Sequence, residues 1–307
     1  MFITLRSNKL TANWLYKLHS MIKSEPEKFR QIAIIFCSMF LCASVCAQSS
    51  DEFFGIKIRP EIRVIINEIE RKTGEDIYIE FVRQEDYMLG SSFISEDGVP
   101  VVLIDYSLED DAKKLEAVVV HELLHLHLRV NNFPTFVFSP TVNTAKGRAK
   151  DTEQGNINDL KNMIEHQVFK PEMEKFGLNK IIDLAGDIAK GARANKNQAD
   201  GQDDAINYAR AILEYPNAKD VIEVQKIYEE NGWKFSLRAG REIADIISQS
   251  NLQTPKDVEA VFLKCLLKLY PPPRPEYIFK LTLDTKNKLF RRIIINTATQ
   301  TVRRKRK

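Results

Sequence analysis

Apolar residues recur with helical spacing soon after the first fifty positions of the chain. Between residues 60 and 73, four isoleucines fall on one face of a helix, and Gly74 follows as a stop signal. The four are Ile62, Ile65, Ile66 and Ile69. This pattern predicts an amphipathic helix with one buried face.

Short runs typical of strands follow this helix. Ile77 to Val82 predicts one strand, and two more are expected around Phe93-Ile94 and from Val99 to Ile104. Between the last two lies Glu96-Asp97-Gly98, a sequence that favours a tight turn. We therefore expect a small antiparallel or mixed sheet that contains a hairpin.

A long apolar helix should come next. Ser107 is a suitable N-cap, and the three acidic residues at 109–111 would favour the positive end of the helix dipole. This helix should run to about Arg129. From 131 to about 155 the sequence has little periodicity, which predicts a long loop that is either a lid or a connector.

The second half of the chain has a mostly helical pattern. One helix is expected from Asn156 to about Phe176, and others from 179 to 270. Breaks between the later helices are expected at 196–203, at Pro216-Asn217 and at Asn231-Gly232. Three prolines at 271–273 end the helices, and Tyr277 to Leu283 with Leu289 to Thr297 predicts a terminal hairpin.

These elements together predict an α+β protein in three structured parts. Residues 48–178 would form a domain with a small sheet beside the long helix. Residues 179–270 would form a helical region that closes the other side of this helix and so completes a cleft. Residues 271–307 would form a β-hairpin with a basic tail.

The first 47 residues have the features of a secretory signal peptide. Positive charges between residues 23 and 30 precede an apolar run from 32 to 46, and Val45-Cys46-Ala47 places small residues at a cleavage site. The run is short for a membrane span, which needs about 20 residues. We therefore expect a periplasmic or secreted protein, which would be membrane-anchored if the segment stays uncleaved.

Net charge and cysteine content limit the kinds of partner and catalysis that we expect. The formal net charge of +3 is too small to indicate a nucleic-acid partner, and no specific nucleic-acid binding is expected. The five basic residues at 303–307 predict a solvated tail or a contact with an anionic surface. Cys265, the only cysteine after the predicted signal peptide, lies among leucines, which indicates a buried thiol and excludes cysteine catalysis.

The strongest chemical signal is the sequence His-Glu-Leu-Leu-His at 121–125. Residues four apart on a helix differ by about 40° around its axis, so His121 and His125 would share one face and reach one Zn²⁺. Glu122 would deprotonate a zinc-bound water and pass the proton to the leaving amine. His127 lies about 200° from His125 and is not expected to bind the same ion.

This segment resembles the active-site motif of the zincin metallopeptidases. The metzincin branch would have glycine at 128 and histidine at 131, where this chain has Leu128 and Asn131. The segment is therefore more similar to gluzincins, whose third zinc ligand is a glutamate on a later helix. The resemblance covers about residues 121–166 and implies a peptide or protein substrate, bound along the strand edge around Phe93-Ile94-Ser95.

A third ligand is expected within Asn-Met-Ile-Glu-His at 162–166. Catalytic zinc takes three protein ligands and keeps one open position. Glu165 flanks the buried stripe of its predicted helix and His166 points further away, which favours Glu165 as the ligand and leaves His166 as the alternative. If His166 is not a ligand, it would be catalytic and stabilise an oxyanion. Asn158 and Asn162 lie on the Glu165 side and are candidates to support the ligands.

The sequence thus predicts an exported zinc peptidase. Glu122 and His166 would be catalytic, and His121, His125 and Glu165 would hold the metal. The alternative is a non-catalytic protein that binds zinc, or an envelope interaction protein. The presence of Glu122 favours the enzyme.

Overall fold

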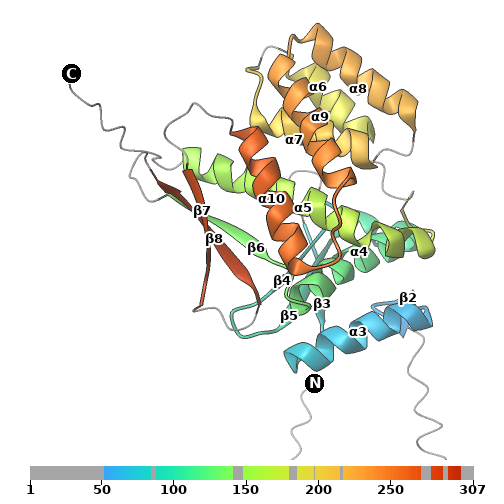
Figure 1. Ribbon diagram of the computed structural model, residues 1–307. Helices are drawn as coiled ribbons and strands as arrows, with labels where there is room; N and C mark the ends of the chain where they lie inside the picture. Colours follow the sequence, from blue (N-terminus) through green and yellow to red (C-terminus); the bar gives the residue numbers. More distant parts are fainter. Residues whose placement is uncertain are drawn as a thin grey trace, which may run out of the picture. The chain divides into compact units, whose positions relative to one another are not determined.

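The computed structural model describes most of the chain after residue 51 (Figure 1). It covers residues 52–83, 88–140, 148–179, 185–196, 198–214, 217–270, 278–285 and 290–298. The predicted signal peptide and the basic tail lie outside these residues. Residues 58–307 group into one compact unit, and the residues before 58 form another.

The described part of the first unit is a tight hairpin. Strand β1 (Glu52–Phe53) pairs antiparallel with β2 (Ile56–Lys57). Phe54 and Gly55 in the turn have φ angles of 55° and 72°. Positive φ at both turn residues is what a type I′ turn requires, and glycine adopts it without steric cost.

Helix α3 (Pro60–Thr73) opens the larger unit and confirms the first predicted helix. All four isoleucines of its apolar face are buried. Gly74 ends the helix with a φ of 78°, and its N–H donates to the carbonyl of Glu70. Such a left-handed residue closes the last turn, and glycine is the residue that adopts it most easily.

A three-stranded sheet follows, as the sequence predicts. It consists of β3 (Tyr78–Val82), β4 (Gly90–Ile94) and β5 (Pro100–Asp105), in the order β3-β5-β4. β5 pairs parallel with β3 and antiparallel with β4, so the predicted hairpin is confirmed. The strand β4 lies at an edge of the sheet and packs on helix α4.

Helix α4 (Ala112–Val130) carries the His-Glu-Leu-Leu-His segment, but it begins later than predicted. Ser107 is not its N-cap, because Ser107 lies in a short 3₁₀ turn and its N–H is bound by Asp105. Asp111 is the N-cap instead, and its carboxylate accepts the N–H of Lys114 at 3.0 Å. The run from 117 to 120 is at most 2% exposed, so packing outweighs the low helix propensity of its three valines.

The prediction of a long loop between residues 131 and 155 is wrong. Strand β6 (Thr135–Pro140) lies inside that stretch, and helix α5 (Arg148–Lys175) begins before its end. β6 pairs parallel with β8 (Arg292–Ala298), which pairs antiparallel with β7 (Ile278–Leu283). The predicted terminal hairpin is therefore confirmed, and it gains a third strand from the middle of the chain.

Within the described residues, five more helices follow α5, and their ends confirm the predicted breaks. They are α6 (Ala185–Ala194), α7 (Gln202–Glu214), α8 (Ala218–Glu230), α9 (Lys234–Ser248) and α10 (Pro255–Leu269). Thr254 caps α10 through a reciprocal capping box with Asp257. Among the described helices, none is long and apolar enough to cross a membrane.

One hydrophobic core joins the second sheet to the helices. It contains Phe136 and Phe138 of β6, Ile293 and Ile295 of β8, and buried residues of α5, α7, α9 and α10. Cys265 is fully buried in this core, which confirms the predicted buried thiol, and burial raises the pKa of that thiol to about 12. The α+β class is thus as predicted, and α5 connects this core to the helix α4.

Candidate metal site

Two histidines on α4 point into the same space. The Nε2 atoms of His121 and His125 lie 3.2 Å apart, because one helical turn separates the two residues. His125 is almost fully buried and His121 is half-buried. The predicted pairing of these two imidazoles on one helix face is therefore present.

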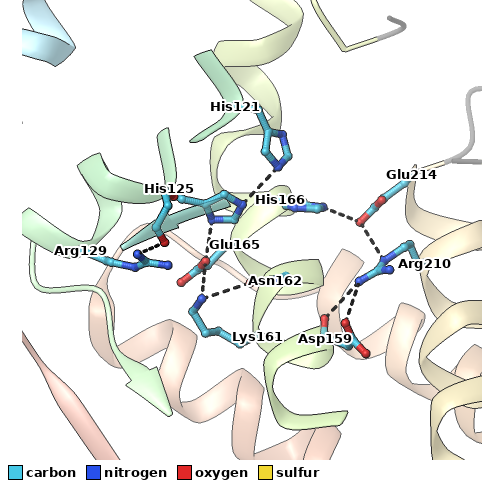
Figure 2. A network of polar contacts seen from close by, with 11 residues as sticks. His121, His125, Arg129, Asp159, Lys161, Asn162, Glu165, His166, Arg210 and Glu214 are labelled. Atoms are coloured by element: carbon cyan, nitrogen blue, oxygen red, sulfur yellow. Dashed lines mark hydrogen bonds and ion pairs between the residues drawn. The ribbon is translucent and has the colours of Figure 1, made fainter. Parts of the chain in front are cut away.

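The third member of the group is His166 on α5. One ligand nitrogen from each of His121, His125 and His166 lies within 4.8 Å of the other two, which is close enough for all three to bind one metal ion (Figure 2). The ring centroids of His121 and His166 are 4.7 Å apart. Among the described residues, this is the group of three side chains suited to hold a metal ion.

Glu165 lies beside His125 and is not part of the group of three histidines. Its Oε2 lies 2.7 Å from Nδ1 of His125 and 3.1 Å from Nζ of Lys161. Burial raises the pKa of Glu165, but the Lys161 charge and the His125 hydrogen bond outweigh it and bring the pKa to about 2. Glu165 is therefore ionised and accepts the Nδ1–H of His125, which leaves Nε2 of His125 free for a metal.

His166 is held in the same way by a residue of α7. Its Nδ1 lies 3.0 Å from Oε1 of Glu214, and Nε of Arg210 lies 3.9 Å from the same oxygen. Burial raises the pKa of Glu214, but the charge and hydrogen bond of His166 and the charge of Arg210 lower it overall. With Nδ1 donating to Glu214, Nε2 of His166 is available as a ligand.

The carboxylates that hold His125 and His166 follow one pattern, which Figure 2 shows. In each, a histidine bonds a carboxylate of a later helix, and a cation four residues earlier on that later helix pairs with the carboxylate. His125 of α4 is held from α5, and His166 of α5 is held from α7. We call this arrangement the histidine relay; it comprises His125, Glu165, Lys161, His166, Glu214 and Arg210.

Burial keeps the histidines of α4 neutral. It lowers the pKa of His125 to about 4, although Glu165 acts in the opposite direction. Burial, with the neighbouring histidines, also lowers the pKa of His121 well below its usual value. Neutral imidazoles have the lone pair that a metal ion needs, so this environment favours metal binding at neutral pH.

Glu122 lies under strand β4. It is 7% exposed, and burial raises the pKa of its carboxyl group, against the opposing influence of Ser92 and Arg129. Gly90 makes this approach of strand to helix possible. A Cβ atom on Gly90 would lie 2.7 Å from Cγ1 of Val118 and 3.1 Å from Cγ of Glu122.

The outer edge of β4 is partly occupied. Leu89 accepts a hydrogen bond from Asp105, and Ser95 donates to Val99, so odd-numbered residues of this strand face β5. Backbone groups of the even-numbered residues 90, 92 and 94 therefore face the free edge. Arg129 donates to the carbonyl of Ser92 and so takes one acceptor of this edge.

Phe169 of α5 packs against all three histidine rings. Its ring centroid lies 5.2 Å from that of His121, 5.0 Å from that of His125 and 5.5 Å from that of His166. Phe169 also lines a cavity of about 420 Å³ between α3, α4 and α5. None of the three histidines lines this cavity, so it adjoins the histidine group without containing it.

The structure places the three other candidate residues, His127, Asn158 and Asn162, in different surroundings. His127 lies outside the histidine group, as predicted, and its Nε2 is 2.8 Å from Glu68. Asn162 accepts a hydrogen bond from Lys161 and so supports the relay, whereas Asn158 is exposed and bonds Gln154.

Sequence reasoning missed Lys161, Arg210 and Glu214. A signal for the first was present, because Lys161 is next to Leu160 on the apolar side of α5 and precedes Glu165 by four residues. Arg210 and Glu214 repeat this spacing on α7. Nothing local in the sequence, however, links α7 to His166, since 48 residues separate His166 from Glu214.

The donor set is suited to zinc. Three imidazole nitrogens, two of them with carboxylates on Nδ1, are a combination typical of catalytic zinc sites with one position open. Imidazole ligands also suit copper, iron and nickel, so the donor atoms by themselves do not fix the metal. The buried carboxylate of Glu122 on the same helix adds a group that can accept a proton.

The chain was compared with known families, with curated proteins and with solved structures, and none of them matches it.

Proposed function

We propose that this protein is a zinc-dependent peptidase. The observation that carries the proposal is the convergence of three imidazoles, His121, His125 and His166, beside a buried carboxylate on the same helix. A buried helix has little reason to carry two histidines and a glutamate unless they serve a metal. The resemblance of residues 121–125 to the zincin motif gives the reaction type.

His166 replaces Glu165 as the proposed third ligand. The carboxylate of Glu165 already accepts from His125 and Lys161, whereas the ring of His166 meets His121 and His125. Glu165 then acts through His125, by fixing the orientation of that ring. In this proposal His166, the alternative ligand expected from the sequence, takes the third position, and Glu165 supports the ligand His125.

Zinc, when bound, supplies a Lewis acid that acidifies a water molecule and polarises a substrate carbonyl. Glu122 accepts the proton of the attacking water and returns it to the leaving amine. Its buried position raises its pKa and therefore strengthens it as a base. Phe169 and the strand β4 keep bulk water away from the carboxylate and the imidazoles.

A peptide substrate would lie along β4. The free edge of this strand offers backbone groups of Gly90 and Ile94, on either side of the carbonyl that Arg129 occupies. An extended peptide that adds to the edge would form hydrogen bonds there and bring one of its carbonyls to the metal. A non-catalytic zinc-binding protein remains the rival interpretation.

Metal analysis and peptide hydrolysis test the proposal. The purified wild-type protein should contain about one zinc ion per chain, and His121→Ala, His125→Ala or His166→Ala should lose it. Glu122→Gln keeps the shape of the side chain and removes the base, so zinc should stay and hydrolysis should fall by about 10²–10⁴. Glu230→Gln, an exposed change on α8, serves as the control.

Two results would contradict the proposal in different ways. Wild-type protein that binds no metal, when purified without chelators, would exclude the metal site. Zinc-loaded wild type that cleaves nothing in a broad peptide library would favour the non-catalytic rival. A third result would change only the ligand and not the function: retention of zinc by His166→Ala, together with its loss from Glu165→Ala, would restore Glu165 as the ligand.

A further inference from the structure

We propose that helix α7 contributes to the metal site, because its residue Glu214 positions His166 for metal binding. This inference rests on the proposed function, because it assumes that the three histidines hold a metal ion. Glu214 does not enter the group of nitrogens itself. It is therefore a positioning residue, which acts through the ring of His166.

The contact between Glu214 and His166 has the geometry of a supporting bond. Oε1 of Glu214 is 3.0 Å from Nδ1 of His166, and the two side chains are only 11% and 17% exposed. At this distance a carboxylate oxygen of Glu214 accepts the Nδ1–H of the ring. With Nδ1 fixed in this way, Nε2 faces His121 and His125.

Further polar contacts fix α7 relative to α5. Arg210 pairs with Glu214 and also reaches Asp159 of α5, with an N–O distance of 3.9 Å in both pairs. Lys170 of α5 donates to the carbonyl of Leu213 at 3.1 Å. These bonds lie on either side of the Glu214–His166 contact, as Figure 2 shows for Asp159 and Arg210.

Packing prevents α7 from moving independently. Ala205, Ile206, Ala209 and Leu213 of α7 share one core with Ile157, Leu160 and Ile164 of α5. On the α9 side, a Cβ atom on Gly240 would lie 2.6 Å from the carbonyl of Ala205, so the two helices are in close contact. The carboxylate of Glu214 is consequently held in place by a rigid element.

A metal ion benefits from this rigidity. A histidine whose ring is already oriented loses less rotamer freedom when it binds, and an ionised acceptor on Nδ1 makes Nε2 a stronger donor. Removal of such a partner typically weakens metal binding about 10–100-fold. Helix α7 lies outside the segment that carries the sequence motif, so this role extends the site into the helical region.

Zinc affinity of the full-length protein, measured by competition with a chromophoric chelator, tests the proposal. Glu214→Ala should weaken zinc binding about 10–100-fold. Glu214→Gln keeps an oxygen that accepts the Nδ1–H and should restore most of the loss. Glu230→Gln on α8, where the carboxylate is exposed, should leave the affinity unchanged.

A double-mutant cycle separates positioning from general destabilisation. His166→Ala should lose its zinc during purification, but the weaker affinity of the two remaining histidines can be titrated at higher zinc concentration. In that background Glu214→Ala should cause no further loss of zinc affinity, because the ring through which it acts is absent. The visible absorption spectrum of the Co²⁺-substituted protein should also change in Glu214→Ala, since it reports the ligand geometry.

Each outcome bears on a specific claim. Wild-type protein that binds no zinc would contradict the proposed function. Wild-type protein that binds zinc, with unchanged affinity and Co²⁺ spectrum in Glu214→Ala, would leave the function standing and overturn the role of Glu214. An equal loss of affinity in the His166→Ala background would also overturn it. If Glu214→Ala fails to fold, Glu214→Asp provides the same comparison, because its carboxylate is one carbon shorter and moves away from Nδ1 of His166.

Discussion

At the residue scale, the distance between strand β4 and helix α4 depends on Gly90. The strand passes so close to α4 that a methyl group on Gly90 would lie 2.7 Å from Val118 and 3.1–3.2 Å from two atoms of Glu122. The distance to Val118 is shorter than a carbon contact allows, and those to Glu122 are tight enough to require a small shift of its side chain. The side chain of Glu122 therefore has its position partly because residue 90 has no side chain.

Gly90→Ala should disturb both stability and chemistry. The added methyl group overpacks the contact, which should cost about 1–3 kcal/mol in the free energy of unfolding. Displacement of Glu122 should lower peptide hydrolysis further than the loss of folded protein accounts for. Urea unfolding and steady-state kinetics check this, with Gly155→Ala on α5 as the control.

Gly155 is a matched control because a Cβ atom there would meet nothing within 4 Å. Alanine in place of glycine inside a helix should stabilise the protein by up to about 1 kcal/mol. Equal activity and stability of wild type and Gly90→Ala would show that β4 can move away from α4 without consequence.

Glu165 and His166 show how far residue patterns predict a site. The helical wheel correctly placed Glu165 nearer the core, where it is 1% exposed. In the proposed site, however, His166 takes the ligand position, because Oε2 of Glu165 already lies within bonding distance of His125 and Lys161. Burial alone did not distinguish a ligand from the carboxylate that supports one.

At the element scale, three carboxylates gather near the first turn of α7. Asp203 and Asp204 lie in that turn, and Asp200 precedes it. Burial, and then the charge of Asp203, raises the pKa of Asp204 from 3.8 to about 7. Because the folded state binds this proton more tightly than the unfolded chain, the associated stability is complete below about pH 3.8 and disappears as the pH rises through about 7.

Asp204→Asn should therefore stabilise the protein at high pH. The amide keeps the size of the side chain and carries no charge at any pH. Above about pH 7 the variant should be more stable than wild type by about 1 kcal/mol, a value reduced for solvent screening. Thermal unfolding between about pH 4 and pH 9 measures this, and the difference should vanish at the acid end. A difference that does not depend on pH would contradict the assignment.

Elements with local signals were predicted well, and those that depend on distant partners were not. The apolar stripe and Gly74 were sufficient for α3. Phe136 and Phe138 alternate over only a few residues, and their strand β6 exists through pairing with β8 near the end of the chain. The start of α4 was missed because Ser107 and Asp111 are both good caps, and the 3₁₀ turn around Ser107 decides between them.

At the scale of the whole molecule, metal binding should stabilise the fold. The proposed ligands come from α4 and α5, and their supports from α5 and α7, so a bound ion connects three helices of one compact unit. Free zinc at about 100 times its dissociation constant should add about 2.7 kcal/mol to the free energy of unfolding.

Thermal unfolding with zinc and with a chelator checks this expectation. Wild type should unfold about 5–10 °C higher with zinc than with the chelator, a range that follows from the size of the protein. His121→Ala should unfold at one temperature in both solutions. A zinc-dependent shift that persists in His121→Ala would place the ion elsewhere.

The histidine relay also has a consequence for the order in which the protein is made. The chain emerges from its N-terminus, so His125 appears first, its partner Glu165 follows 40 residues later, and Glu214 appears 48 residues after His166. A nascent chain that has reached only α4 presents two histidines without fixed rings. On the proposed function, its metal centre would mature only when α7 docks, and this delay would keep the centre inactive while neighbouring segments are still unfolded.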